Sequence, residues 1–153
     1  MLVTALAGCD FRSETAKKEM EKFSGTPTPS ISPPPTELPP DPSEVVEVDV
    51  NLQGKETVSV DGYDQKKSVD CTRLDRVMIN GDRSVVTIKG ACRQIMINGD
   101  DNQITSDAAI EFVINGVRNS VKYSRFVNGK RPIIKENTAG NNIEKIESSG
   151  VTH

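Results

Sequence analysis

Three stretches of the chain repeat one pattern, in which three apolar residues run directly into Asn-Gly. The asparagines are Asn80, Asn98 and Asn115, so the pattern recurs after 18 and then 17 residues. A small polar residue stands four positions after each of these asparagines, and an apolar residue follows two positions later. A repeat this regular is typical of a structural unit that stacks on copies of itself. The apolar triplets are Val77-Met78-Ile79, Ile95-Met96-Ile97 and Phe112-Val113-Ile114, and the small polar residues are Ser84, Asn102 and Asn119.

Each repeat predicts two short strands separated by a polar corner. In a short parallel β-solenoid of about three to four coils, the three asparagines would stack and hydrogen-bond from coil to coil. In the alternative, an antiparallel β-sandwich or barrel, Asn-Gly would form hairpin turns, but the polar stretch between apolar runs is too long for two-residue turns. We therefore predict an all-β fold and prefer the solenoid. The corner glycines Gly81, Gly99 and Gly116 would permit positive φ.

Weaker patterns flank these repeats. Apolar residues alternate with polar ones from Val46 to Leu52, which predicts a half-buried strand. Val58 and Val60 predict another short strand, whereas Asp61–Lys67 is polar and is expected to be a loop. A fourth, irregular unit is expected from Ile133-Ile134 to Ile143. The predicted β domain spans residues 45–146, and residues 147–153 are expected to be a disordered tail.

Composition limits what the core contains. Aromatic residues make up 4% of the 153-residue chain and Trp is absent, so stacked Val and Ile must supply most of the buried surface. The net charge is −3, which by itself points to no particular class of partner.

The segment before the β domain is expected to be a tether. Eight of the nine prolines fall between Pro27 and Pro42. Proline fixes φ and removes backbone donors, so residues 24–44 are predicted to form an extended spacer. Residues 10–23 are expected to be a short helix or disordered, because an isolated helix of this length is marginal in water.

The first nine residues end in Leu6-Ala7-Gly8-Cys9, which resembles the bacterial lipobox. The resemblance implies cleavage before Cys9 and attachment of lipid to its thiol. Only eight residues precede Cys9 and none is charged, whereas export signals are longer and begin with basic residues. We therefore expect the true start upstream of Met1 and a protein anchored in the bacterial cell envelope. The alternative is a soluble protein with a free thiol.

If Cys9 carries lipid, Cys71 and Cys92 remain. An export compartment is oxidising, so this even remainder predicts a disulfide, with free buried thiols as the alternative. A metal site is disfavoured because the only histidine is His153 and neither cysteine belongs to a C-x-x-C motif.

The repeat region resembles a known bacterial family, the domain of unknown function 3060. The resemblance lies in Cys71, the Ile/Val-Asn-Gly units, Gly90-Ala91-Cys92 and the Gly-x-x-Asn-x-Val phrase at Gly116–Val121, and it covers roughly residues 45–146. It implies a secreted or lipid-anchored protein. The family has no established activity, so the resemblance implies no catalytic residues.

Two sets of residues are candidates for contact surfaces. The middle residues of the triplets should point out of a solenoid as an apolar stripe, open to a partner or covered by residues 45–60. From Phe112 to Lys135 no side chain is acidic, so the basic residues there are candidates for binding an anionic surface, although a solvated face is the alternative. The stripe is Met78, Met96 and Val113, and the basic set is Arg118, Lys122, Arg125, Lys130, Arg131 and Lys135.

The leading functional hypothesis is a non-enzymatic, lipid-anchored envelope protein that binds a partner or has a structural role, with no cofactor. The first alternative is a carbohydrate- or polyanion-binding module that uses the basic 118–135 stretch. The second is a small glycan-active enzyme, which no spacing of carboxylates supports. Nucleic acid is not an expected partner, because an exported lipoprotein seldom meets it.

Overall fold

The computed structural model describes residues 39–51, 54 and 56–148. The predictions for the lipobox with Cys9, for residues 10–23 and for most of the spacer lie outside the described residues, as does most of the expected tail. The end of the spacer contains a 3-10 turn at Pro42–Glu44 (η2), which the proline content alone did not predict. Proline is tolerated in this first turn, and the carboxylate of Asp41 accepts a hydrogen bond from the backbone N–H of Ser43 at 2.9 Å.

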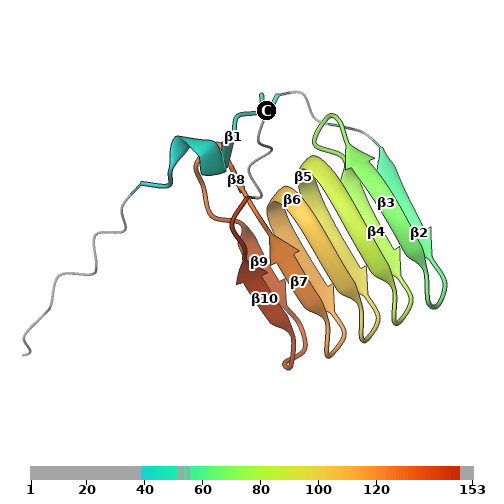
Figure 1. Ribbon diagram of the computed structural model, residues 1–153. Helices are drawn as coiled ribbons and strands as arrows, with labels where there is room; N and C mark the ends of the chain where they lie inside the picture. The colour runs from blue at the N-terminus through green and yellow to red at the C-terminus, as the bar shows by residue number, and fades with distance from the viewer. Residues whose placement is uncertain (1–38, 52–53, 55, 149–153) are drawn as a thin grey trace, which may run out of the picture. The chain divides into compact units, whose positions relative to one another are not determined.

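The described chain forms a parallel β-solenoid of about five turns, which confirms the preferred fold class. Every pair of named strands is parallel, so the antiparallel sandwich or barrel is wrong. Figure 1 shows the strands lying side by side in chain order, from β2 at one end to β10 at the other. The strands are β1 (Val45–Val46), β2 (Thr57–Asp61), β3 (Lys66–Cys71), β4 (Arg76–Asn80), β5 (Val85–Asn98), β6 (Gln103–Asn115), β7 (Ser120–Tyr123), β8 (Phe126–Val127), β9 (Ile133–Glu136) and β10 (Asn142–Lys145).

Each coil contributes one strand to each of two faces. The first face stacks β2, β4, the second halves of β5 and β6, and β9. The second face stacks β3, the first halves of β5 and β6, β7, and β10. Two coils more than the three Asn-Gly repeats are therefore present, one at each end of the stack.

The additional first coil explains an incorrect prediction. Lys66 and Lys67 were expected in a loop, but they begin β3, where they pair in register with Val85 and Val86. Asp61–Gln65 forms the same kind of corner as Asn80–Ser84, and Asp61 is in register with Asn80. This strand forms because it pairs with the neighbouring coil, not because its own sequence has an apolar pattern. The sequence pattern alone therefore did not predict it.

The half-buried strand predicted from Val46 to Leu52 is also wrong. Only Val45–Val46 forms a strand, and it pairs with β8. Beyond it, the side chain of Asn128 replaces a strand partner, because it accepts from the N–H of Val48 at 2.8 Å and donates to the C=O of Val48 at 3.0 Å. Val50 is 51% exposed.

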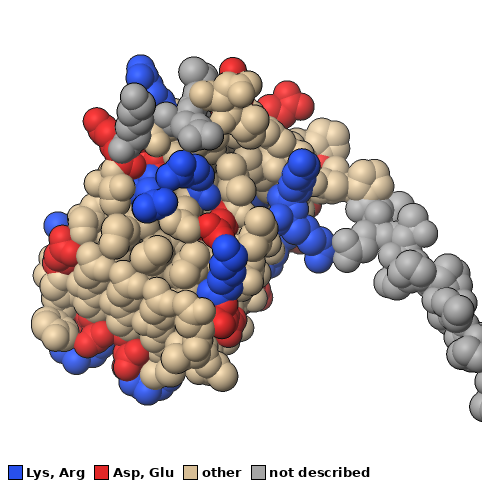
Figure 2. Space-filling view, turned by 180° about the vertical axis from the view of Figure 1, so that it is seen from behind, with Lys and Arg blue, Asp and Glu red and all other residues tan. Residues whose placement is uncertain are grey.

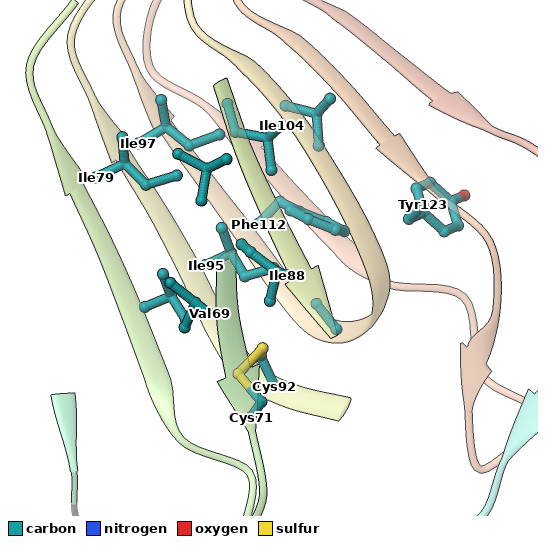
Figure 3. Close-up of a cluster of buried hydrophobic side chains, with 14 of the residues drawn as sticks. Val69, Cys71, Ile79, Ile88, Cys92, Ile95, Ile97, Ile104, Phe112 and Tyr123 are labelled. Carbon is teal, nitrogen blue, oxygen red and sulfur yellow. A yellow bond between two sulfur atoms is a disulfide. The ribbon is translucent and has the colours of Figure 1, made fainter. Parts of the chain in front are cut away.

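The core is a thin double layer of Val and Ile between the two faces. Predicted apolar columns lie in register from coil to coil and are almost completely buried. Figure 3 shows side chains of both faces, such as Ile97 and Ile104, pointing into the space between them. Each buried Val or Ile contributes about 1.5–3 kcal/mol, so repetition compensates for the scarcity of aromatic residues. The columns are Val77, Ile95 and Phe112; Ile79, Ile97 and Ile114; and Val86, Ile104 and Val121.

The difference between the 18- and 17-residue periods has a structural cause. The pairing of β5 with β6 changes register between Ile88 and Ala91. Gly90 lies at this point with φ of 78°, and a Cβ there would lie 2.4 Å from the backbone oxygen of Cys71. The second coil therefore accommodates its extra residue in a bulge that glycine permits.

The corner glycines are required chiefly by close backbone approach. A Cβ on Gly81, Gly99 or Gly116 would lie 1.9, 2.1 or 1.9 Å from the carbonyl oxygen of the glycine in the preceding coil. The predicted positive φ holds at Gly81 and Gly99 but not at Gly116. The left-handed conformation falls instead two residues later in these corners, at Arg83, Asp101 and Arg118, with φ from 55° to 58°.

A buried polar ladder runs inside the same corners. Ser84, Asn102 and Asn119 are at most 1% exposed. The side-chain oxygen of Asn102 accepts from the N–H of Ser84 at 2.9 Å, and its amide donates to the C=O of Gly81 at 2.8 Å. Asn119 repeats both contacts one coil later, at 3.0 and 2.9 Å. The ladder therefore satisfies backbone groups that would otherwise be buried without partners.

Cys71 of β3 and Cys92 of β5 form a disulfide that joins the first two coils. The cysteines are 6% and 0% exposed, so the bridge lies within the core.

We predict that Asn102→Ala lowers the free energy of unfolding by about 2–4 kcal/mol, because it leaves the buried N–H of Ser84 and C=O of Gly81 unpaired. Asn98→Ala is the matched control: Asn98 lies in a half-buried ladder on the surface, where water replaces the lost amide, and we expect a loss below about 1 kcal/mol. Urea denaturation measures both values. Equal losses in the two variants would show that the inner ladder has no special role.

We predict that Cys71→Ala/Cys92→Ala lowers the free energy of unfolding by about 3 kcal/mol, the value expected for opening a loop of this length. The sequence separation is 21 residues. Thermal unfolding with and without dithiothreitol checks this: the parent should lose stability on reduction and the double variant should not. A parent protein indifferent to reductant would contradict the disulfide.

Candidate functional site

The three repeat asparagines form an outer ladder along the edge of the first face. Asn98 Nδ2 donates to Asn80 Oδ1 at 2.8 Å, and Asn115 Nδ2 donates to Asn98 Oδ1 at 2.7 Å. The ladder continues beyond the repeats, because Asn137 donates to Asn115 and Asn80 donates to Asp61 Oδ1 at 2.7 Å. Hydrogen bonds from Asn80 and then Ser59 lower the pKa of Asp61. An ionised carboxylate has no proton to donate, so it terminates the ladder.

Alternating charges occupy the left-handed position of successive corners. The guanidinium of Arg83 bonds Asp64 through two contacts of 2.9 Å, and that of Arg118 bonds Asp101 through two contacts of 2.7 Å. These fork-shaped pairs lower the pKa of Asp64 and Asp101 and raise the pKa of both arginines. Because all four side chains are well exposed, the pairs set register more than they add stability.

The outward apolar stripe of Met78, Met96 and Val113 lies on the first face, in register and half-buried. The interpretation that residues 45–60 cover it is wrong for the described part of that segment. Val46 and Val48 pack against a separate small cluster at the opposite corner, and β2 is itself the first coil. That cluster consists of Leu74, Ala91, Ala108 and Val127.

The six basic residues of the 118–135 stretch do not form one surface. Arg118 lies at a corner, Lys122 on the second face, and Lys135 on the first face. Arg118, Arg125 and Lys135 pair with Asp101, Asp107 and Glu111 of the preceding coil, and Lys135 is the main cause of a lowered pKa at Glu111. Lys130 and Arg131 line a cleft of about 230 Å³ with apolar neighbours such as Ile133. Figure 2 likewise shows acidic and basic side chains interspersed.

The second face carries a groove, lined mainly by Ser, Thr and charged residues, that sequence reasoning missed. It has a volume of about 650 Å³ and extends over β5 and β6 to the segments at Ser43 and Ile146–Ser148. Thr87 and Thr105 point outward on it and are register partners. Thr87 directly follows Val86 and Thr105 directly follows Ile104, so the repeat alignment could have predicted that the two threonines stack. The sequence could not have predicted that the segments at Ser43 and Ile146–Ser148 border the same groove.

An ion pair lies at one side of this groove. Arg125 Nε contacts Asp107 Oδ1 at 2.6 Å, and Arg125 Nη2 contacts Asp107 Oδ2. The two side chains are 35% and 21% exposed, and hydrogen bonding to Asp107 raises the pKa of Arg125. The pair is therefore fixed in orientation while part of it still faces solvent.

Within residues 39–51, 54 and 56–148, no three His, Cys, Asp or Glu side chains are grouped so as to hold a metal ion. The same part of the chain has no helix long and apolar enough to cross a membrane.

Comparison with known proteins links the repeats to a family. Residues 79–142 match the model of the family described as "Protein of unknown function (DUF3060)". No curated protein and no solved structure matches the chain. The matched segment contains all three Asn-Gly corners and four of the positions in the outer ladder, from Asn80 to Asn137. The match confirms, for residues 79–142, the resemblance seen in the sequence.

Proposed function

We propose that the chain is an exported, lipid-anchored protein of the bacterial cell envelope that displays a rigid, non-enzymatic binding domain. The observation that carries the proposal is the disulfide between Cys71 and Cys92, because structural disulfides form and persist in oxidising compartments outside the cytosol. The lipobox-like residues before Cys9 and the proline-rich spacer supply the anchor and the distance from the membrane.

The architecture favours binding over catalysis. Parallel coils held in register by two polar ladders make a stiff scaffold, whose repeated rows of outward side chains present an extended surface. A general acid needs a raised pKa to be protonated at neutral pH. The carboxylates of Asp64, Asp101 and Glu111 instead have lowered pKa values and are paired with Arg or Lys. None of these three carboxylates is therefore suited to act as a general acid.

The polyanion-binding alternative has less support than the basic sequence suggested. At least three of its six cations are paired with carboxylates, and the set is divided between two faces and the corners. Local attraction to a polymer of negative charge needs several uncompensated cations on one surface. An uncharged carbohydrate ligand does not require such a cluster of cations.

We predict that Cys9→Ala moves the protein from the membrane pellet to the soluble fraction of a bacterial lysate, because the thiol that carries the lipid is lost. Fractionation, combined with metabolic labelling by an alkyne fatty acid, measures the change. Cys71→Ala/Cys92→Ala is the matched control and should remain labelled and pelleted. A Cys9→Ala protein that stays in the pellet, or a parent without label, would refute the anchor.

A further inference from the structure

We propose that the groove on the second face, lined mainly by Ser, Thr and charged residues, binds a neutral, hydroxyl-rich polymer, that is, a segment of uncharged polysaccharide. This goes beyond the anchoring proposal, because it assigns the groove a ligand class. Only the source of the ligand, the cell envelope, rests on the proposed function; binding itself does not.

The size and position of the groove suit an extended chain. Its volume of about 650 Å³ lies within the range of small-molecule sites. It crosses strands of consecutive coils and is bordered by Ser43 and Ile146–Ser148. Thr87 and Thr105 pair in register, so they stand side by side on strands whose backbones are about 4.8 Å apart. Two equivalent hydroxyls in a row are suited to a ligand whose own hydroxyls repeat.

The Arg125–Asp107 pair provides donors and acceptors together. A guanidinium has five N–H donors, and the contacts with Asp107 leave others directed elsewhere. Asp107 Oδ1 also accepts from the hydroxyl of Ser124 at 3.2 Å, so its orientation is fixed from two directions. Adjacent sugar hydroxyls each donate and accept, and a fixed arginine–carboxylate pair matches both needs.

The charge of the groove favours a neutral ligand. Its basic residues are Lys89 and Arg125, and its acidic residues are Asp107 and Glu147. The charges balance, so the lining as a whole gives a polyelectrolyte no net attraction. This separates the groove from the anion-binding surface expected at 118–135.

A buried serine without a hydrogen-bond partner lies beneath the groove. Ser106 also lines the groove and is 1% exposed, yet its hydroxyl has no hydrogen-bond partner among the described residues. It occupies a core position between Ile88 and Tyr123 of the adjacent coils. An unpaired buried hydroxyl lowers stability, so hydrogen bonding within the described residues does not explain a serine at this position.

The test uses the purified full-length chain carrying Cys9→Ala, so that lipid does not interfere. Native gels containing dextran, mannan or a mixed-linkage β-glucan should retard it in at least one case. The retardation should persist in 0.5 M NaCl, a concentration of roughly the order at which exposed charges are strongly screened. Thr87→Val/Thr105→Val, which keeps shape and strand preference, should weaken binding at least about tenfold, the value of roughly one lost hydrogen bond.

Arg125→Lys should weaken binding to a similar degree, because lysine keeps the charge but not the fork. Thr57→Val is the matched control: it lies exposed in β2, on the other face, and should bind like the parent. Circular dichroism establishes that each variant is folded. The proposal is overturned if no neutral polymer retards the parent, if only heparin does so and salt abolishes the effect, or if the threonine variant binds normally. None of these results would bear on whether Cys9 carries lipid.

Discussion

Stacking of equivalent residues in successive coils is the constraint on which this structure depends. The strands on the two faces obtain their ladder hydrogen bonds from the equivalent strands of the adjacent coils. A solenoid of this kind has no large core to compensate for an error in register. Register is therefore specified several times over, by apolar columns inside, by the buried Asn102 ladder at the corner and by the outer Asn98 ladder beside it.

At the two ends of the stack, pairing must stop. A regular end coil would expose an edge to which strands of another molecule could add. The end coils place charges at core columns: Lys67 is in register with Val86, and Glu136 is in register with Ile114. On the second face, Lys145 of the last coil is in register with Tyr123. Its ammonium group pairs with Glu44 and lies 5.3 Å from the ring centroid of Phe126. Charged residues at these positions make the end strands unfavourable partners for another strand, a common means of preventing edge-to-edge aggregation. The last corner also departs from Asn-Gly: the hydroxyl of Thr138 accepts from the N–H of Gly116 at 2.9 Å.

The same regularity that stabilises the fold leaves the surface free for recognition. Inward positions of β5 and β6 carry Val, Ile, Phe112 and small residues, whereas outward positions carry Thr, Met, Asn and charged groups in rows. Ion pairs between coils neutralise Arg118, Arg125 and Lys135 of the basic 118–135 stretch. Paired hydroxyls beside the fixed Arg125–Asp107 pair are therefore a better candidate for a binding surface than a field of positive charge. Recognition by this domain is then a matter of hydrogen-bond geometry on a rigid face.

Sequence alone determined the parts of the structure that repeat. The spacing of Asn80, Asn98 and Asn115 predicted parallel stacking and the outer ladder, and the apolar columns followed from the same alignment, because identical environments select identical residues. Prediction from sequence failed where neighbouring segments decide the structure. β3 begins with two lysines that were expected in a loop. Val46–Leu52 alternates like a strand but lacks partners along most of its length. The groove could not be predicted from the sequence either, because segments far apart in the chain line it.

Only the tertiary structure decided how distant segments meet. Arg118, Arg125 and Lys135 look like one basic patch along the chain, yet the coil turns them in different directions and pairs each with an acid about one coil away. Thr87, Arg125 and Ile146 are far apart in sequence but share one groove. A repeat reveals itself in the sequence because each coil imposes the same local requirement, whereas a surface built from different coils depends on where the winding of the chain places each side chain.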